Sequence, residues 1–92
     1  MQKTHDLFFA LVGRKVRGRI LAYLLVQHPK ARYIAEIAGA VRTHPSSAQR
    51  ELRQLERLGL VDSSSGSYRK YYRLRVSSPV VELLRRIWTH SR

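Results

Sequence analysis

Apolar residues recur every three or four positions in the first part of the chain, which is the spacing of helices that bury one face. The stretch 7–28 has this pattern on both sides of Gly13, so the glycine predicts a kink or a break between two helices. Pro29 predicts an end near His28, because proline disfavours helical geometry in the residue that precedes it. A second, short helix is predicted over 33–41, where apolar residues recur at the same spacings.

The clearest amphipathic pattern lies in the next helix, which is predicted from Pro45 to about Leu58. Proline suits the first position of a helix, and Gly59 suits its end. On a helical wheel the core side, about 60° wide, holds Ala48, Leu52 and Leu55. The opposite side, about 40° wide, holds Ser46, Arg50, Arg53 and Arg57. The short connection to the preceding helix is typical of a helix-turn-helix, which is predicted over 33–58.

After Gly59 the spacing changes from helical to alternating, which predicts a β-hairpin, or wing, over 60–76. We interpret the run Ser63–Ser67 as its turn and 68–76 as a strand. Alternation places one set of side chains together, namely Tyr72, Leu74 and Val76. The other side of the strand is cationic and holds Arg69, Tyr71, Arg73 and Arg75.

Ser78 and Pro79 open a last helix that continues through Trp88. Its apolar stripe is nearly 100° wide and consists of Val80, Val81, Leu84, Ile87 and Trp88. The predicted fold class is therefore mainly α with a β-hairpin, in the order α-α-α-β-β-α. The 92 residues fit one domain, 1–92, with the layout of a winged helix-turn-helix.

The charge balance points to a polyanionic partner. There are 18 lysines and arginines against 6 acids, which gives a formal net charge of +12. The basic residues are interleaved with apolar ones at regular spacing, which argues against a disordered basic arm. They gather on the third helix and on the hairpin, so the expected partner is a nucleic acid.

Other classes of function find little support in the sequence. Cysteine is absent, which excludes disulfide scaffolds and thiolate metal sites. The four histidines lack ligand spacing, and the serine run has no positioned base, so we expect no metal, no cofactor and no enzymatic activity. No apolar run reaches the ~18 residues of a membrane span, and no signal peptide is evident. We expect a cytoplasmic protein with no membrane partner.

Several segments together resemble the small winged-helix transcriptional regulators of the arsenic-repressor-like (ArsR-type) and MarR-type superfamily. These segments are RGRILAYLL (17–25), YIAEIA (33–38), PSSAQRELRQLERLGLV (45–61) and YRKYYRL (68–74). The resemblance implies binding of operator DNA as a homodimer. The chain departs from the metal sensors of that superfamily, whose cysteine-rich sites are impossible here. It also has His44 before Pro45, so the helix is capped either by Thr43 or by Ser46 with Gln49.

If the fold is correct, the helix 45–58 enters the major groove of double-stranded DNA. Arg50 is the first candidate for reading guanine, and Gln49 for reading adenine. Backbone contacts are expected from the other residues of this region, which are Thr43, Ser46, Ser47, Arg53 and Arg57. Arg69 and Lys70 of the wing are expected either to enter a minor groove or to contact its phosphates. The alternative is that the arginines form a solvated face paired with Glu51 and Glu56, and that Arg69 and Lys70 protect a strand edge.

The helices at the two ends, 7–28 and 80–90, carry more apolar surface than one chain readily covers. Dimerisation would bury this surface. The expected interface consists of Leu7, Phe8, Leu11, Val81, Leu84, Ile87 and Trp88. The alternative is that the first and last helices pack on each other within one monomer.

These features predict a homodimeric transcriptional regulator, and a repressor in particular, that reads an inverted-repeat operator. Two other classes remain open. An RNA-binding or nucleoprotein-associated module would use the same charge, with stacking by tyrosines at 68, 71 or 72. A module that binds only proteins would need a strongly acidic partner. The target genes and any small-molecule effector are not encoded in these patterns.

Overall fold

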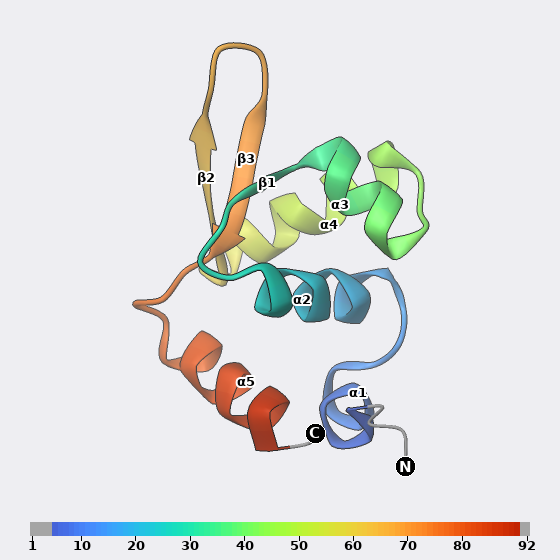
Figure 1. Cartoon of the computed structure of the whole chain (residues 1–92), viewed down its shortest axis with the longest axis vertical. Coiled ribbons are helices and arrows are strands. Elements are labelled where there is room, and N and C mark those ends of the chain that lie inside the picture. Colours follow the sequence, from blue (N-terminus) through green and yellow to red (C-terminus); the bar gives the residue numbers. More distant parts are fainter. Residues whose placement is uncertain (1–4, 91–92) are drawn as a thin grey trace.

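The computed structural model describes residues 5–90 and contains the predicted elements with one addition (Figure 1). The elements are α1 (Asp6–Val12), α2 (Val16–Gln27), β1 (Arg32–Tyr33), α3 (Ile34–Val41), α4 (Pro45–Arg57), β2 (Val61–Ser65), β3 (Lys70–Leu74) and α5 (Pro79–His90). The mainly helical fold class with an antiparallel hairpin is confirmed. The addition is the short strand β1, which lies between α2 and α3.

Gly13 separates α1 from α2, as the sequence predicted. It has a φ of 86°, a conformation that glycine adopts without a steric penalty. Its N–H still donates to the carbonyl of Phe9, at 2.8 Å, and so closes the last turn of α1. The loop then passes so close to α2 that a Cβ on Gly18 would lie 1.9 Å from the carbonyl oxygen of Gly13. Glycine is therefore required at position 18 for this approach.

The sheet is antiparallel and has the strand order β1-β3-β2. The interpretation of Ser63–Ser67 as one turn is wrong in its first half, because Ser63, Ser64 and Ser65 belong to β2 and pair with Tyr72, Tyr71 and Lys70. The aromatic partner strand supplies the packing that holds these poor strand formers in place. The predicted strand 68–76 is also too long. Since β3 ends at Leu74, Val76 does not join Tyr72 and Leu74 in the core and is 61% exposed.

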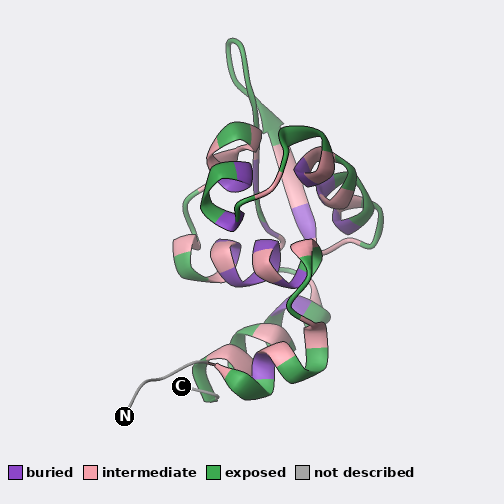
Figure 2. Cartoon of the chain, turned by 90° about the vertical axis from the view of Figure 1, so that its right-hand side faces the viewer, coloured by how far each residue is buried: buried purple, intermediate pink, exposed green. Residues whose placement is uncertain are grey.

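The core lies where α2, α3 and α4 meet each other and the sheet. The buried faces of the three helices point toward one another and toward β3 (Figure 2). The largest fully buried side chains include Tyr72 from β3, Ile20 and Leu24 from α2, and Leu52 from α4. This body positions the helix-turn-helix and the hairpin on one side of α2.

Helices α1 and α5 lie side by side below this body (Figures 1 and 2). The ring of Phe8 meets the ring of Trp88 edge to face, with centroids 5.0 Å apart. Phe8 and Val81 are fully buried within the single chain, so their assignment to a surface that meets a partner is corrected. The alternative of packing within one monomer thus accounts for part of the terminal apolar surface.

Candidate nucleic-acid interface

Helix α4 separates its apolar and basic residues on opposite sides. Its core side is fully buried and consists of Ala48, Leu52 and Leu55. Its outer side is exposed and carries Arg50, Arg53 and Arg57. Because a helix rises about 1.5 Å per residue, the three arginines extend over roughly 10 Å of that side. The predicted division into a core side and a cationic side is confirmed.

The acids near these arginines are turned to other partners. Glu51 accepts a hydrogen bond from Nε of Arg17 at 2.8 Å, and Glu56 accepts one from Oγ of Ser63 at 2.7 Å. Asp62 pairs with Arg75, also at 2.7 Å. Within residues 5–90, the three outer arginines of α4 form no ion pair and no side-chain hydrogen bond. Their guanidinium groups keep all their donors for an external partner.

The start of α4 differs from both predicted caps. His44 occupies the N-cap position and its side chain makes no capping hydrogen bond, while Pro45 is the first helical residue. The proposed caps Thr43 and Ser46 are therefore wrong, because fixing Pro45 at the first position shifts the cap to the residue before it. The N–H groups of Ser46 and Ser47 have no partner within the helix and carry the positive end of its dipole.

The turn between α3 and α4 is held by backbone contacts. Arg42 has a φ of 58°, in the left-handed region that glycine favours, and its side chain is exposed. The N–H of Thr43 donates to the carbonyl of Ala38 at 3.0 Å. Nε of Arg19 donates to the carbonyl of Val41 at 3.1 Å, which ties the end of α3 to α2. These bonds fix the direction in which α4 leaves the turn.

The wing, defined as 60–76, carries Arg69 and Lys70 next to its turn, and Arg73 and Arg75 farther along the chain. The N–H of Gly66 donates to the carbonyl of Arg69 at 2.7 Å and closes the turn. Arg69 and Lys70 are exposed, and the guanidinium carbon of Arg69 lies 4.0 Å from the ring centroid of Tyr33. β3 has a neighbour on both sides at Tyr71 and Tyr72, but Lys70 pairs with β2 alone, so its other edge is open.

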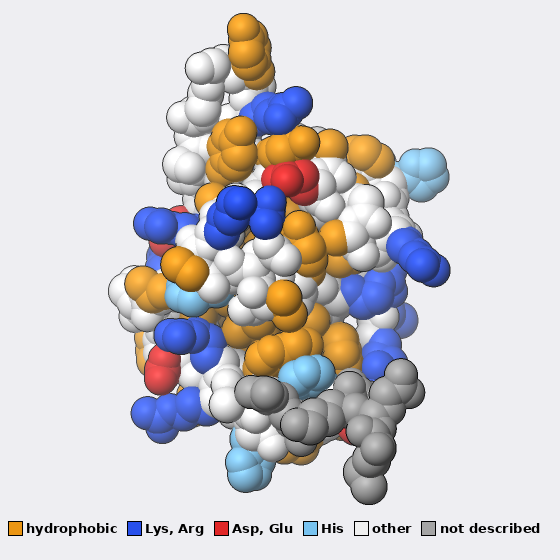
Figure 3. Space-filling model, in the orientation of Figure 1, with side chains coloured by type: hydrophobic (Ala, Val, Ile, Leu, Met, Phe, Trp, Pro, Cys, Tyr) orange, Lys and Arg blue, Asp and Glu red, His pale blue; other side chains and the backbone are white. Residues whose placement is uncertain are grey.

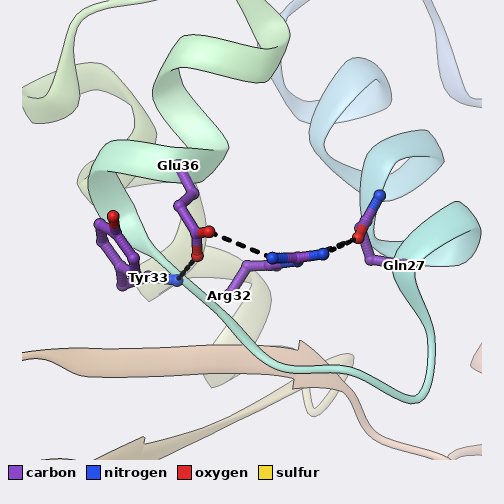
Figure 4. Close-up of polar contacts among 4 residues, drawn as sticks. All are labelled: Gln27, Arg32, Tyr33 and Glu36. Carbon is purple, nitrogen blue, oxygen red and sulfur yellow. Dashed lines mark hydrogen bonds and ion pairs between the residues drawn. The ribbon is translucent and has the colours of Figure 1, made fainter.

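Tyr33 is a feature of this site that the sequence analysis missed. It belongs to β1, lies opposite Tyr71 in the sheet and contacts the ring of that residue at a centroid distance of 5.8 Å. Its N–H donates to Glu36, which also pairs with Arg32, and Arg32 in turn donates to Gln27 (Figure 4). A two-residue strand shows no alternation, so only its neighbouring aromatic and basic residues could have drawn attention to it.

Two pKa values are shifted near this region. Burial raises the pKa of the Tyr72 hydroxyl, and the carboxylate of Glu56 raises it further, while Arg53 acts in the opposite direction. Burial lowers the pKa of His28, and the positive charges of Arg85 and Arg73 lower it further. The Nδ1 atom of His28 is buried without a hydrogen-bond partner, which fits a neutral ring.

The described residues offer little for other chemistry. Between residues 5 and 90 no group of three or more histidines and acids is arranged to hold a metal ion. In the same part of the chain, no helix is both long enough and apolar enough to cross a membrane. Within residues 5–90 the basic residues on the exposed side of α4 and at the tip of the wing form no ion pair, although Arg69 and Lys70 face the rings of Tyr33 and Tyr72.

The terminal helices leave apolar side chains in contact with solvent. Leu7, Leu11, Val80 and Leu83 are between 45% and 63% exposed. Leu84, Ile87 and Trp88 are half-buried and pack against the core. Of the expected interface, Leu7 and Leu11 are therefore open to a partner, and the half-buried residues are partly so.

This geometry has counterparts among solved structures, although no family model and no curated protein matches the sequence. MepR, a transcription regulator of the Staphylococcus aureus multidrug efflux pump MepA, superimposes with a TM-score of 0.72 at 22% identity, over 94% of this chain and 68% of MepR. A MepR variant bound to an oligodeoxyribonucleotide gives the same TM-score, at 21% identity, with 94% of this chain and 63% of that chain covered.

Two further structures match over most of their length. AF1382 from Archaeoglobus fulgidus has a TM-score of 0.73 at 18% identity, over 89% of this chain and 90% of its own. The homodimeric winged helix-turn-helix DNA-binding domain of Mb0332 from Mycobacterium bovis, a possible ArsR-family transcriptional regulator, has a TM-score of 0.69 at 23% identity, over 94% and 76%. The fold is a winged helix. In this winged helix α3 and α4 form the helix-turn-helix, and β2 and β3 form the wing.

Proposed function

We propose that this protein is a transcriptional regulator that binds double-stranded DNA as a homodimer, with α4 in the major groove. The observation that carries the proposal is the outer side of α4, where three exposed arginines have no ion pair within residues 5–90. Phosphate groups and guanine edges are the partners that a guanidinium fork matches bidentately. A helix of this width fits the major groove of B-form DNA.

The residues of α4 divide into two roles in this proposal. Arg50 reads guanine and Gln49 reads adenine, each pair being worth about 1–3 kcal/mol of discrimination against a wrong base. The remaining residues position the protein on the backbone, namely Thr43, Ser46, Ser47, Arg53 and Arg57. The free N–H groups at the start of α4 support a phosphate near Ser46 and Ser47.

The homodimer is supported by the apolar side chains that α1 and α5 expose, among them Leu11 at 63% and Leu83 at 57%. The matching domain of Mb0332 is homodimeric, and a MepR variant has been solved with an oligodeoxyribonucleotide. A twofold dimer places two copies of α4 about 34 Å apart, so the operator is an inverted repeat. In this proposal the protein represses by occupying that operator, and it works in the cytoplasm.

Fluorescence anisotropy tests the proposal. The protein is titrated with a duplex from its own upstream promoter, a random duplex and a matched single-stranded RNA, at several salt concentrations. We expect preference for the promoter duplex and a log–log salt slope near −7, which corresponds to about eight phosphates per dimer. Equal or tighter binding to the RNA would replace this proposal with an RNA-binding module.

A pair of variants separates the face of α4 from net charge. Arg50→Ala and Arg86→Ala each remove one exposed arginine, but Arg86 lies on α5 and pairs with Glu82. We expect Arg50→Ala to reduce the preference for the promoter duplex about tenfold or more, and Arg86→Ala to leave it unchanged. Equal effects of the two variants would mean that α4 makes no specific contact.

A further inference from the structure

A hollow of about 360 Å³ lies between the wing and the first residues of α3 and α4. Its walls are formed by Tyr33 from β1, by Ile34 and Ala35 from the start of α3, by Pro45 from the start of α4, and by Tyr68, Arg69 and Lys70 from the wing. Apolar side chains gather where the wing meets α3, with basic side chains beside them (Figure 3). The hollow thus joins the wing to the beginning of the helix that we place in the major groove.

The ring of Tyr33 forms the floor under the guanidinium group of Arg69. The guanidinium carbon lies 4.0 Å above the ring centroid, which is within the range of a cation–π contact. Such stacking uses the face of the planar guanidinium group and leaves its N–H donors at the edge. Within the described chain those donors have no acid and no hydrogen-bond acceptor. Arg69 is therefore held in place but unsatisfied.

Tyr33 is itself fixed by contacts with two residues, Glu36 and Tyr71. Glu36 accepts a hydrogen bond from its N–H at 3.2 Å, Tyr71 lies opposite it in the sheet, and their rings are in contact (Figure 4 shows the bond to Glu36). Gly66 of the wing turn packs against the ring of Tyr71, because a Cβ at Gly66 would lie 3.0 Å from an atom of that ring. The wing tip is thereby packed against the start of α3 through aromatic rings.

The charge of the hollow is positive. The carboxylate of Glu36 belongs to the same segment, but Arg32 neutralises it with a contact of 3.1 Å. Arg69 and Lys70 carry no such counter-charge within residues 5–90, and Lys70 is exposed. The hollow thus combines the positive charges of Arg69 and Lys70 with the aromatic ring of Tyr33. This combination matches a ligand that has negative charges along its length and apolar sugars between them.

We propose that Tyr33 is the positioning residue of Arg69: its ring holds the guanidinium group in this hollow so that the N–H donors at the edge of that group meet a phosphate of the DNA backbone. This inference rests on the proposed function, in which a phosphate contact of Arg69 is already expected, and adds to it the role of Tyr33. Tyr33 does not contact the base edges, so it contributes affinity and orientation without sequence preference. The wing then binds DNA through the side chain of Arg69, which the ring of Tyr33 already holds in position. Less conformational entropy is therefore lost on association.

The test uses the full chain with the promoter duplex and the random duplex, and measures both affinity and salt slope. Arg69→Ala is expected to weaken binding to both duplexes about tenfold and to reduce the slope by about 0.9 for each protomer bound. Tyr33→Leu is expected to give the same two changes, with little further loss in the double variant. Tyr33→Phe keeps the ring and is expected to bind like the wild type. Arg86→Ala is the control for the loss of one positive charge.

The outcomes separate this inference from the proposed function. If the wild type binds duplex DNA and Arg69→Ala binds equally well, the phosphate contact of Arg69 is wrong and the rest of the proposed function stands. A loss of affinity in Tyr33→Leu without a change in slope would mean that Tyr33 supports the fold and does not position Arg69. If the wild type itself prefers single-stranded RNA or binds neither duplex, both proposals fail. Arg69 is an exposed turn residue, so its variant decides the question even if Tyr33→Leu does not fold.

Discussion

Helices α4 and α5 both begin with a proline and both have one apolar and one charged side, but only α4 has its apolar side covered by its own chain. The three core residues of α4 are fully buried. In α5 only Val81 is fully buried, while Val80 and Leu83 remain 48% and 57% exposed. Within the described fold, what α4 leaves for a partner is positive charge, and what α5 leaves is apolar surface. In the proposed function the two helices therefore meet different partners, DNA for α4 and a second copy of the chain for α5.

The two helices also differ in whether a side chain caps their first turn. In α5 the N–H of Val81 donates to Oγ of Ser78 at 3.3 Å, so the first turn is capped from within. In α4 the residue at the corresponding place is His44, whose side chain makes no such bond. A helix start that lacks a side-chain cap is less stable but presents free N–H groups to an anion. This contrast agrees with the assignment of α4, and not α5, to the DNA.

The largest expected effect is on the free energy of unfolding, when packed leucines of α4 and α5 are truncated. Leu52→Ala should lower the free energy of unfolding by about 2–5 kcal/mol, because it removes fully packed methyl groups from the centre. Leu84→Ala, at a half-buried position of α5, should lower it by about 1 kcal/mol at protein concentrations where the chain is monomeric. Urea denaturation followed by circular dichroism measures both. Equal losses would show that α5 is as fully packed within one chain as α4.

A charge on the exposed side of α5 should affect assembly more than stability. Leu83→Glu is expected to weaken self-association at least tenfold, since a carboxylate would be buried in the proposed interface, while the free energy of unfolding of the monomer changes by about 0.5 kcal/mol or less. Val26→Glu, at a residue of α2 that is 61% exposed, is the matched control. Sedimentation equilibrium measures the change. A wild type that stays monomeric at micromolar concentration would remove α5 from any homodimer interface.

The side-chain cap can be removed from α5 and introduced into α4 to test this difference. Ser78→Ala should lower the free energy of unfolding by about 1 kcal/mol, because it removes the cap of α5. His44→Ser should raise that free energy by about 0.5–1 kcal/mol, because it supplies a cap that α4 lacks. Thermal denaturation at a fixed protein concentration gives both values. No gain from His44→Ser would indicate that the first turn of α4 is already satisfied.

The smallest effect concerns pH and His28, which lies between the body and α5. Its pKa is lowered in the fold by burial and by Arg85 and Arg73, so the unfolded chain binds the proton more readily. Stability is therefore full above the ordinary pKa of 6.5 and is lost as the pH falls below it toward the lowered value. The melting temperature should decrease between pH 7.5 and pH 5.5, and His28→Gln should flatten that decrease. His44→Gln, at an exposed histidine, should leave it unchanged.

The helices and their ends followed from the sequence to within one or two residues. Periodic spacing located α3 and α4, and Gly13 and Gly59 marked breaks that both have positive φ in the structure. These features are local, since a glycine or a proline restricts the backbone whatever surrounds it. The strand content followed less well. Ser63–Ser65 and the two residues of β1 form strands only because β3 lies between them.

The candidate site likewise contains features that the sequence predicted and features that it did not. The basic side of α4 was predicted because both the core residues and the arginines lie on one helix, whose geometry is fixed. The contact between Arg69 and Tyr33 was not, because the residues are far apart in sequence and meet only when β1 pairs with β3. The burial of Phe8 and Val81 was likewise decided by the packing of α1 and α5 against the body.

The sequence alone therefore determined where the helices lie, which side of α4 is charged and how large the net positive charge is, because backbone restriction, helical period and net charge are properties of the chain itself. The tertiary structure decided which acids neutralise which arginines, which helix start stays without a side-chain cap and how much apolar surface remains exposed. Those properties depend on distances between residues remote in sequence, and such distances exist only once the core has packed.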